Sequence, residues 1–351
     1  MDLNLFRPVL LSSETRIEDI YLQHPNSFFV DAFERQLKEL FFIDYDNFIG
    51  EPKNEVYNSE EFLNYQKNKS DDFVYIYYPW NQTIVKSVKE DDYFKLKTNR
   101  NQDLITAEEQ KKLYNYKVAV FGMSVGSNIA FVLTQAGISK DIVLADFDEL
   151  DTTNLNRIWA GVHQVGLNKA VIAARRIYED NPYANVTLLI KGVTPANLKK
   201  LLESGKIDCI VEEIDNVSIK VEIRKLAFKY KKPVLMITDN GDGIVLHVER
   251  YDLGYDKMFG KSFDDWDIKI SKIKSPIDIG NLIVNEILGG IEKVDSRVLQ
   301  SVQRVFKKEL ISWSQLGSAA LLGGVVSTYM IKKIALNENN EKYIEKSVFP
   351  L

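Results

Sequence analysis

Cysteine is almost missing from this chain of 351 residues, which contains only Cys209. One cysteine cannot form an intramolecular disulfide, and it cannot supply the two C-x-x-C pairs of a cysteine-rich zinc site. The three histidines, His24, His163 and His247, are scattered and have no metal-ligand spacing. We therefore expect no zinc site, and a reducing, cytoplasmic setting fits this low use of cysteine.

The chain also lacks an excess of positive charge. Lys and Arg number 45 against 50 Asp and Glu, which gives a net charge of -5. A protein that binds the phosphate backbone of nucleic acids needs clustered positive charge, so we expect no nucleic-acid partner. The first residues, MDLNLFRPVLLSSETRIED, lack a basic segment followed by an unbroken apolar run, because Asp2 and Arg7 interrupt them. They therefore predict no targeting segment.

Long hydrophobic runs are scarce as well. A single uncharged stretch, residues 313–331 (WSQLGSAALLGGVVSTYMI), approaches the length of a membrane span. Its serines, threonine, glutamine and glycines lower its mean hydropathy. We predict a buried helix whose small residues allow close packing, and no membrane segment.

The residues that are present describe a globular protein, because 45% of them are hydrophobic and 27% are charged. Residues 1–98 predict a small α+β region that could recognise a substrate. Within it, residues 27–42 carry apolar side chains at helical spacing and predict an amphipathic helix. The runs FVYIYY and TIVKSV flank a Pro-Trp-Asn-Gln turn and predict a β-hairpin.

Residues 99–254 have a different pattern. Five apolar runs, KVAVFG, DIVLAD, VTLLIK, DCIVEE and PVLMIT, alternate with stretches of helical periodicity. The predicted helices span residues 128–137, 168–179, 195–203 and 217–230. This alternation indicates an α/β fold with a Rossmann-like, mostly parallel sheet and helices on both faces. Residues 255–351 are predicted to form a C-terminal extension that contains the small-residue helix.

The first strand–helix junction reads Gly122-Met-Ser124-Val-Gly126-Ser127. A tight turn of small residues lets the backbone approach a phosphate at the amino end of a helix. Ser124 and Ser127 occupy the second and third glycine positions of the usual G-x-G-x-x-G pattern. From this turn alone, nucleotide binding and an ordinary strand–helix turn are equally good interpretations.

Polar residues follow the later strands. Asp146 and Asp148 end the second strand, where a carboxylate would meet the ribose of either ATP or NAD. Two further cationic side chains and an amide suit the triphosphate of ATP better than the dinucleotide of NAD, and an aspartate can hold the Mg²⁺ that accompanies ATP. These residues are Asn154, Arg157, Lys169 and the pair Asp215-Asn216. The alternative is that Arg157 and Lys169 form surface ion pairs and that Asp215 caps the next helix.

The ordered motifs D-F-D-x5-N-L-x-R, G-x-x-K, N-P and D-N resemble those of the ThiF/E1-like adenylyltransferases, over about residues 104–245. That superfamily includes ubiquitin-activating enzymes, activators of sulfur-carrier proteins and a peptide-adenylylating enzyme of microcin C7 biosynthesis. The resemblance implies that Asp146 binds the ribose and that Asp215 holds Mg²⁺, with Asn216 beside it. It also implies the following further nucleotide-binding residues: Gly122, Ser124, Gly126, Asp148, Asn154, Arg157 and Lys169.

The resemblance further implies an enzyme that uses ATP and Mg²⁺ to adenylylate a carboxylate, with Arg157, Lys169 and Asp215 as catalytic residues. The expected substrate is the C-terminus of a small protein or peptide, and a homodimer is expected. Many members bind zinc through cysteines and some use a catalytic cysteine. Cys209 lies in a predicted central strand, where a thiol behaves as a small buried hydrophobe. We therefore expect the chemistry of this chain to stop at the acyl-adenylate.

Two other functions remain open at this point. The domain could be an NAD-binding oxidoreductase, in which case Arg157 and Lys169 would be dispensable. It could also be a non-catalytic E1-like partner subunit. The altered glycine turn favours this second alternative, whereas the retained Asn154, Arg157, Lys169 and Asp215 oppose it.

Overall fold

The computed structural model describes residues 6–349, apart from the side chain of Pro276. Asp2, which counted against a targeting segment, lies outside the described residues. The chain divides into two compact units. One contains the residues up to 110 together with 181–183, and the other contains residues 111–180 and those from 184 onward.

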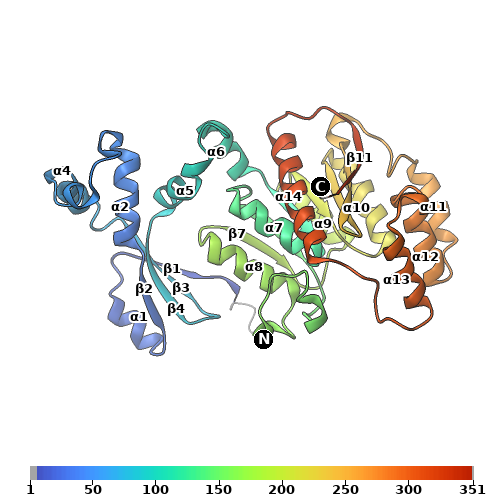
Figure 1. Cartoon of the computed structure of the whole chain (residues 1–351), viewed down its shortest axis with the longest axis horizontal. Helices are drawn as coiled ribbons and strands as arrows, with labels where there is room; N and C mark the ends of the chain where they lie inside the picture. The colour runs from blue at the N-terminus through green and yellow to red at the C-terminus, as the bar shows by residue number, and fades with distance from the viewer. Residues whose placement is uncertain (1–5, 350–351) are drawn as a thin grey trace. The chain divides into compact units, whose positions relative to one another are not determined.

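The first unit is built on a four-stranded sheet in the order β1-β3-β4-β2 (Figure 1). β3 and β4 pair in antiparallel register, which confirms the predicted hairpin. The strands are β1 (Val9–Ser12), β2 (Phe28–Asp31), β3 (Phe73–Tyr78) and β4 (Thr83–Val88). The helices are α1 (Ile17–Gln23), α2 (Phe33–Asp44), α3 (Lys53–Val56), α4 (Glu60–Asn68) and α5 (Glu90–Thr98), and α6 (Ala107–Asn115) begins in this unit.

Aromatic side chains form the core of this unit. The ring of Phe41 on α2 meets Phe62 and Tyr65 of α4 edge-to-face, with centroids 5.2 and 5.4 Å apart. Such pairs add stabilisation beyond the area that they bury. The phenol of Tyr65 also donates a hydrogen bond to Asp44, so the two helices are fixed at both an apolar and a polar contact.

The helix predicted at residues 27–42 was wrong in its first part. Residues 28–31 form β2, which pairs in parallel with β4. The helix begins only at Phe33, whose backbone N–H donates to the carboxylate of Asp31. Helical periodicity included Phe29 because its spacing matched, but pairing with a distant strand overrode that local pattern.

The second unit contains a seven-stranded sheet in the order β11-β10-β9-β8-β5-β6-β7. The five strands from β9 to β7 are parallel, and β10 and β11 are antiparallel additions at one edge. This is the predicted Rossmann-like, mostly parallel sheet. The strands are β5 (Val118–Phe121), β6 (Asp141–Ala145), β7 (Asn185–Leu189), β8 (Cys209–Glu212), β9 (Val234–Asn240), β10 (Gly243–Glu249) and β11 (Tyr343–Val348).

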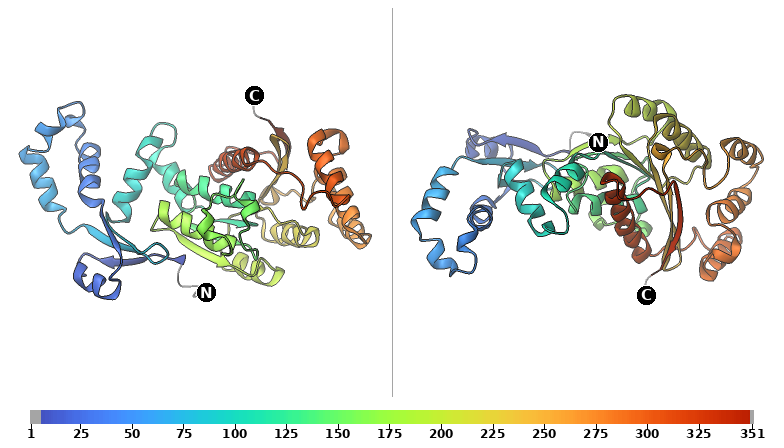
Figure 2. Two further views of the ribbon diagram at one scale, coloured as in Figure 1. Left: turned by 60° about the horizontal axis from the view of Figure 1, so that its bottom comes forward. Right: turned by 90° about the horizontal axis from the view of Figure 1, so that it is seen from above.

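Helices cover both faces of this sheet (Figure 2). On one face, α14 (Gly317–Ala335) packs on α7 (Val125–Gln135), which in turn contacts α8 (Lys169–Asp180). On the other face lie α9 (Pro195–Glu203) and α10 (Val217–Tyr230), with the bounds that the sequence predicted. The remaining helices are α11 (Phe263–Ser271), α12 (Pro276–Leu282) and α13 (Ser296–Phe306).

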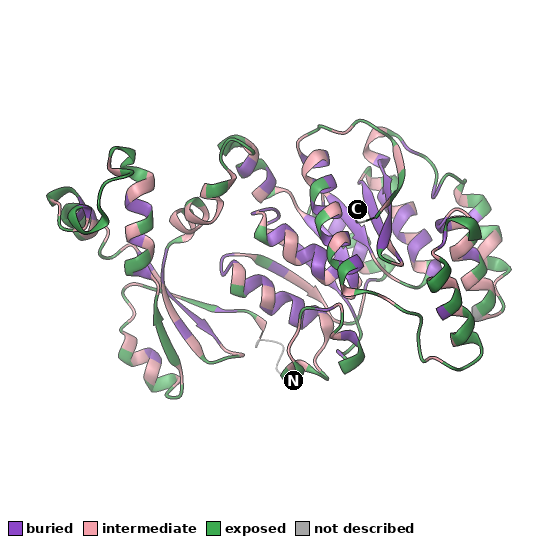
Figure 3. Ribbon diagram, viewed as in Figure 1, coloured by how far each residue is buried: buried purple, intermediate pink, exposed green. Residues whose placement is uncertain are grey.

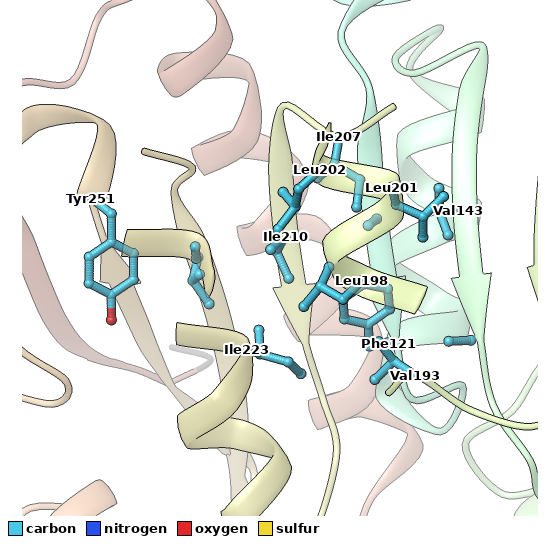
Figure 4. Close-up of a cluster of buried hydrophobic side chains, with 14 of the residues drawn as sticks. Phe121, Val143, Val193, Leu198, Leu201, Leu202, Ile207, Ile210, Ile223 and Tyr251 are labelled. Atoms are coloured by element: carbon cyan, nitrogen blue, oxygen red, sulfur yellow. The ribbon is translucent and has the colours of Figure 1, made fainter. Parts of the chain in front are cut away.

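The core between the sheet and α9 and α10 is apolar and almost fully buried (Figures 3 and 4). Phe121 and Ile210 contribute from the central strands, and Leu198 and Ile223 contribute from the two helices. Cys209 is completely buried in β8, and burial raises the pKa of its thiol. A thiol in this position serves packing and has no access to a substrate.

The uncharged stretch near the C-terminus forms the buried helix α14. Gly323 and Gly324 face neighbouring elements so closely that an added Cβ would lie 3.1 Å from Ile237 and 3.0 Å from the carbonyl of Asn128. Small residues therefore let α14 approach α7 and β9, as predicted. Within residues 6–349, the structure contains no helix that is both long and apolar enough to cross a membrane.

A buried ionic cluster joins β8, α10 and β10. Arg224 lies between two carboxylates, 2.7 Å from Glu212 and 2.5 Å from Glu249, and Lys220 lies 2.9 Å from Glu212. Burial opposes the charged form of Glu212, but Lys220 and Arg224 outweigh this effect and lower its pKa. The two cations and two anions balance, which is the condition for keeping charges in a protein interior.

We expect Arg224→Ala to lower the free energy of unfolding by about 3–5 kcal/mol, because it leaves Glu249 buried without a cation and Glu212 with Lys220 alone. The control is Arg304→Ala, which removes a half-exposed ion pair with Glu309 and should cost no more than about 1 kcal/mol. Urea denaturation measures both values. Equal destabilisation by the two substitutions would contradict the role of the cluster.

Candidate active site

The predicted site residues gather at the carboxyl ends of the parallel strands. β5 lies between β6 and β8 in the sheet. The strands that follow it in sequence first extend the sheet on one side, as β6 and β7, and then on the other side, as β8 and β9. A crevice at such a reversal of strand order is the usual ligand site of open α/β sheets. The loops that follow β5, β6, β8 and β9 meet here, and they carry the polar residues described below.

The turn after β5 depends on Gly122. Its φ is +91°, and an added Cβ would lie 2.4 Å from the carbonyl oxygen of Glu213 after β8. Only glycine satisfies both conditions. α7 starts at Val125, three residues earlier than predicted, so Gly126 lies in its first turn and not in the loop. There an added Cβ would come within 2.9 Å of Val120, so Gly126 lets the helix pack on β5.

Asp146 holds this turn in place. Its carboxylate accepts hydrogen bonds from the backbone N–H of Met123, at 2.6 Å, and of Asp148, at 2.8 Å. Burial raises the pKa of Asp146, and the two backbone donors counteract this effect. The residue predicted to meet a ribose therefore also fixes the backbone of the glycine turn.

Lys169 enters the crevice from the first residue of α8. Its Nζ lies 3.0 Å from Asp148, and its side chain is 11% exposed. Asn168 places it there, because its amide donates to the carbonyl of Asp146 at 3.0 Å and accepts from the N–H of Ala170. Asp146, Asp148 and Lys169 are thus brought together, as the motif implied.

Arg157 lies directly against the glycine turn. Its Nε donates to the hydroxyl of Ser124 at 2.9 Å, and its Nη1 donates to the side chain of Asn156 at 3.0 Å. Burial lowers the pKa of Arg157, while the charges of Asp239 and Asp215 act in the opposite direction. Arg157 therefore lies within electrostatic reach of both aspartates.

Asn154 shapes the loop that carries Arg157. It ends the 3₁₀ turn Thr152–Asn154, and its side-chain oxygen accepts from the N–H of Asp151 at 3.1 Å. The residue is buried and turned into its own loop. In this position, Asn154 stabilises the backbone conformation of the loop from which Arg157 extends.

Asp215 and Asn216 are neighbours in sequence but have different surroundings. Asn216 caps α10 by accepting from the N–H of Ile219 at 3.1 Å. Asp215 is exposed, and within residues 6–349 no hydrogen bond or ion pair engages its carboxylate. The helix cap considered as an alternative for Asp215 therefore belongs to its neighbour. A free carboxylate at this edge of the sheet is the kind of ligand that Mg²⁺ takes, because this ion is often bound by one or two carboxylates together with substrate phosphates.

Sequence reasoning missed two acids at the same edge. Glu213 accepts from the N–H of Ile237 at 2.8 Å, and burial raises its pKa well above the ordinary value. Asp239, near the end of β9, accepts from Gln315 at 3.2 Å, and burial raises its pKa to about 6. Both stand at the end of an apolar strand run, as Asp146 does, although Glu212 and Thr238 come directly before them, and that placement was the available signal. Gln315, far along the chain, gave no signal.

We expect Asp239→Asn to stabilise the protein more at pH 8 than at pH 5. The folded pKa of about 6 exceeds the ordinary 3.8, so the folded state binds the proton more tightly. The free energy of unfolding should therefore fall as the pH rises from about 4 to about 6, and then stay level. Asparagine removes this cost, worth about 3 kcal/mol at pH 8, and still accepts from Gln315. Thermal unfolding at several pH values measures the effect, and a pH-independent difference would contradict it.

Comparison with known proteins places this site in a family. Residues 96–245 match the model of the ThiF family. The uncharacterized protein MT1398 of Mycobacterium tuberculosis is 33% identical over 276 residues, which cover 75% of this chain and 36% of that protein. The tRNA threonylcarbamoyladenosine dehydratase of Bacillus subtilis is 31% identical over 139 residues, which cover 39% of this chain and 54% of the relative. This chain thus spans only about a third to a half of these relatives.

A solved structure shares the fold. The E. coli tRNA N6-threonylcarbamoyladenosine dehydratase TcdA, crystallised with AMP, aligns with a TM-score of 0.51 and 20% identity, covering 72% of this chain and 99% of that one. The glycine turn and the polar residues from Asp146 to Asp239 lie within the segment that matches the family model. Residues 96–245 are therefore a ThiF-family domain, which confirms the expected resemblance of this segment to the ThiF/E1-like superfamily.

Proposed function

We propose that this protein binds Mg·ATP in the crevice beyond β5, β6 and β8 and adenylylates a substrate carboxylate. The observation that carries the proposal is the placement of Arg157, which is bonded to Ser124 of the glycine turn and within electrostatic reach of the free carboxylate of Asp215. A cation, a phosphate-sized turn and an available metal ligand are what a triphosphate requires.

In the proposed reaction, a carboxylate oxygen of the substrate forms a bond to the α-phosphorus, and the bond from that phosphorus to the bridging oxygen breaks. Pyrophosphate leaves with the electron pair. Arg157 and Lys169 stabilise negative charge on the phosphate oxygens, and the turn positions the phosphates. The carboxylate of Asp146 accepts hydrogen bonds from the ribose hydroxyls. When bound at Asp215, Mg²⁺ would neutralise further phosphate charge.

We propose the C-terminus of a small protein or peptide as the substrate. The net charge of -5 supports this class over a nucleic acid, because an acidic chain repels a phosphate backbone. One relative is named for a modified tRNA nucleoside, so tRNA is the second substrate class to test. The buried position of Cys209 supports an activity that ends at the acyl-adenylate, without a thioester on this chain.

We expect ATP-dependent exchange of labelled pyrophosphate in the presence of a suitable carboxylate. Asp215→Ala should slow the exchange by about 100-fold or more, because charge stabilisation at the phosphates is lost. The matched control is Glu203→Ala, at the far end of α9 and therefore near the amino edge of the sheet. This control should leave the exchange unchanged.

Thermal unfolding with added nucleotide tests nucleotide binding separately from the substrate. ATP with Mg²⁺ should raise the melting temperature of the wild type, and NAD should not. If ATP does not bind, or if NAD binds instead, the proposed function is wrong. If ATP binds, the pyrophosphate-exchange assay is repeated with peptides that have a free C-terminus and, separately, with tRNA.

We further propose that two copies of the chain pair through α14. Leu321, Val325 and Tyr329 are spaced four residues apart on this helix and remain exposed, although each is large and apolar. Side chains at this spacing line one face of a helix. A face of this kind on a folded unit is typical of a surface that meets a partner.

We expect the wild type to sediment as a dimer at micromolar concentration and Val325→Arg to sediment as a monomer, because the charge would be buried unpaired. Ile268→Arg, a substitution of an equally exposed isoleucine on α11, is the control and should stay dimeric. A monomeric wild type, or a dimer that tolerates Val325→Arg, would refute this arrangement.

A further inference from the structure

The segment between α13 and α14 reaches the active site from the far end of the sequence. Gly317, the first residue of α14, lies so close to the Arg157 loop that an added Cβ would be 2.2 Å from the carbonyl oxygen of Asn156. No side chain fits in that space. The segment is therefore in direct contact with the loop that carries the phosphate-binding arginine.

Gln315 connects this segment to two parts of the site. Its backbone carbonyl accepts a hydrogen bond from the side-chain amide of Asn156 at 2.8 Å. Its own side-chain amide donates to Asp239 at 3.2 Å. One residue thus bridges the loop after β6 and the end of β9, which are adjacent only in the folded sheet.

The bridge sets the orientation of Asn156. Because the Nδ2 of Asn156 donates to Gln315, its Oδ1 faces the guanidinium of Arg157 and accepts from Nη1 at 3.0 Å. On its other side, Arg157 donates to Ser124 of the glycine turn. A continuous chain of hydrogen bonds therefore runs from Asp239 through Gln315 and Asn156 to Arg157.

Asp239 holds the side chain of Gln315 at the start of this series of hydrogen bonds. Its carboxylate lies near the end of β9, and its Oδ1 is buried without a hydrogen-bond partner within residues 6–349. Loss of the hydrogen bond from Gln315 would leave the second carboxylate oxygen of Asp239 without a partner as well, which costs free energy in a buried site. Gln315 is therefore held tightly, and its carbonyl is held with it.

We propose that Gln315 and Asp239 are positioning residues that orient Arg157, through Asn156, toward the phosphates of the nucleotide. This inference rests on the proposed function, since it assigns Arg157 to the phosphates of ATP. In this arrangement both residues act on the nucleotide only through Asn156 and Arg157. Their loss should therefore weaken the binding of phosphate groups and leave the binding of the nucleoside unchanged.

The experiment compares ATP with adenosine by calorimetric titration of the full chain. Gln315→Ala should bind Mg·ATP roughly tenfold more weakly, the usual effect of losing one hydrogen bond near a charged group. Adenosine should bind within twofold of the wild type. The control Gln300→Ala removes an exposed glutamine of α13 and should change neither affinity. Gln315→Met, which is close in size, repeats the test if the alanine variant does not fold.

Two further variants separate positioning from general destabilisation. Asp239→Asn keeps an acceptor for Gln315 and should bind ATP at least as well as the wild type, whereas Asp239→Ala should resemble Gln315→Ala. The combination of Gln315→Ala with Asn156→Ala should be no worse than the weaker-binding single variant, because both act through one chain.

The outcomes distinguish the two proposals. A wild type that does not bind ATP refutes the proposed function. A wild type that binds ATP, together with a Gln315→Ala variant that keeps its ATP affinity or loses ATP and adenosine affinity equally, refutes only the positioning role.

Discussion

The whole site depends on the approach of Gly122 to the carbonyl of Glu213. β5 and β8 pair in parallel, and the lack of a side chain at Gly122 lets the turn lie against the end of β8, at the point where the strand order reverses. This arrangement places the N–H of Met123 over Asp146 and the hydroxyl of Ser124 beside Arg157. Any side chain at position 122 would separate these groups, because interiors are packed too densely to absorb a 2.4 Å contact.

Two consecutive acids at the end of β8 serve opposite faces of the sheet. Glu212 points toward α10 and joins the buried cluster with Arg224, whereas Glu213 lies on the side of Gly126 and binds the backbone of Ile237. This division follows from the alternation of side chains along a strand. One short stretch therefore couples the packing of α10 to the crevice in which the nucleotide is proposed to bind.

Local pattern predicted much of the second unit. Continuous apolar runs identified its parallel strands, and α9 and α10 have the predicted bounds, because burial on both faces leaves a strong signal in composition. The pattern failed at Phe29, where strand pairing with β4 decided the structure. It also placed the start of α7 too late, because small residues such as Gly126 carry little periodic signal.

The site could be predicted only where it lies close to a strand end. Asp146, Arg157 and Lys169 follow one another along the chain, and a motif could group them. Gln315 and Asp239 are separated by 76 positions and meet only in the folded sheet. Their hydrogen bond depends on how α14 packs on α7, and no local rule contains that information. The use of Asn216 as the cap of α10, beside an unengaged Asp215, likewise depended on backbone geometry.

The late position of α14 and β11 has a consequence for how this protein is made. The segment that matches the family ends at residue 245, but β10 pairs with β11 about a hundred residues later, and α7 is covered by α14. A chain that stops at residue 245 would leave an unpaired strand edge and an uncovered apolar helix, both of which promote aggregation. During synthesis, the crevice at the carboxyl ends of the strands can be completed only after Gln315 and α14 have left the ribosome. The family segment alone is therefore not the folding unit.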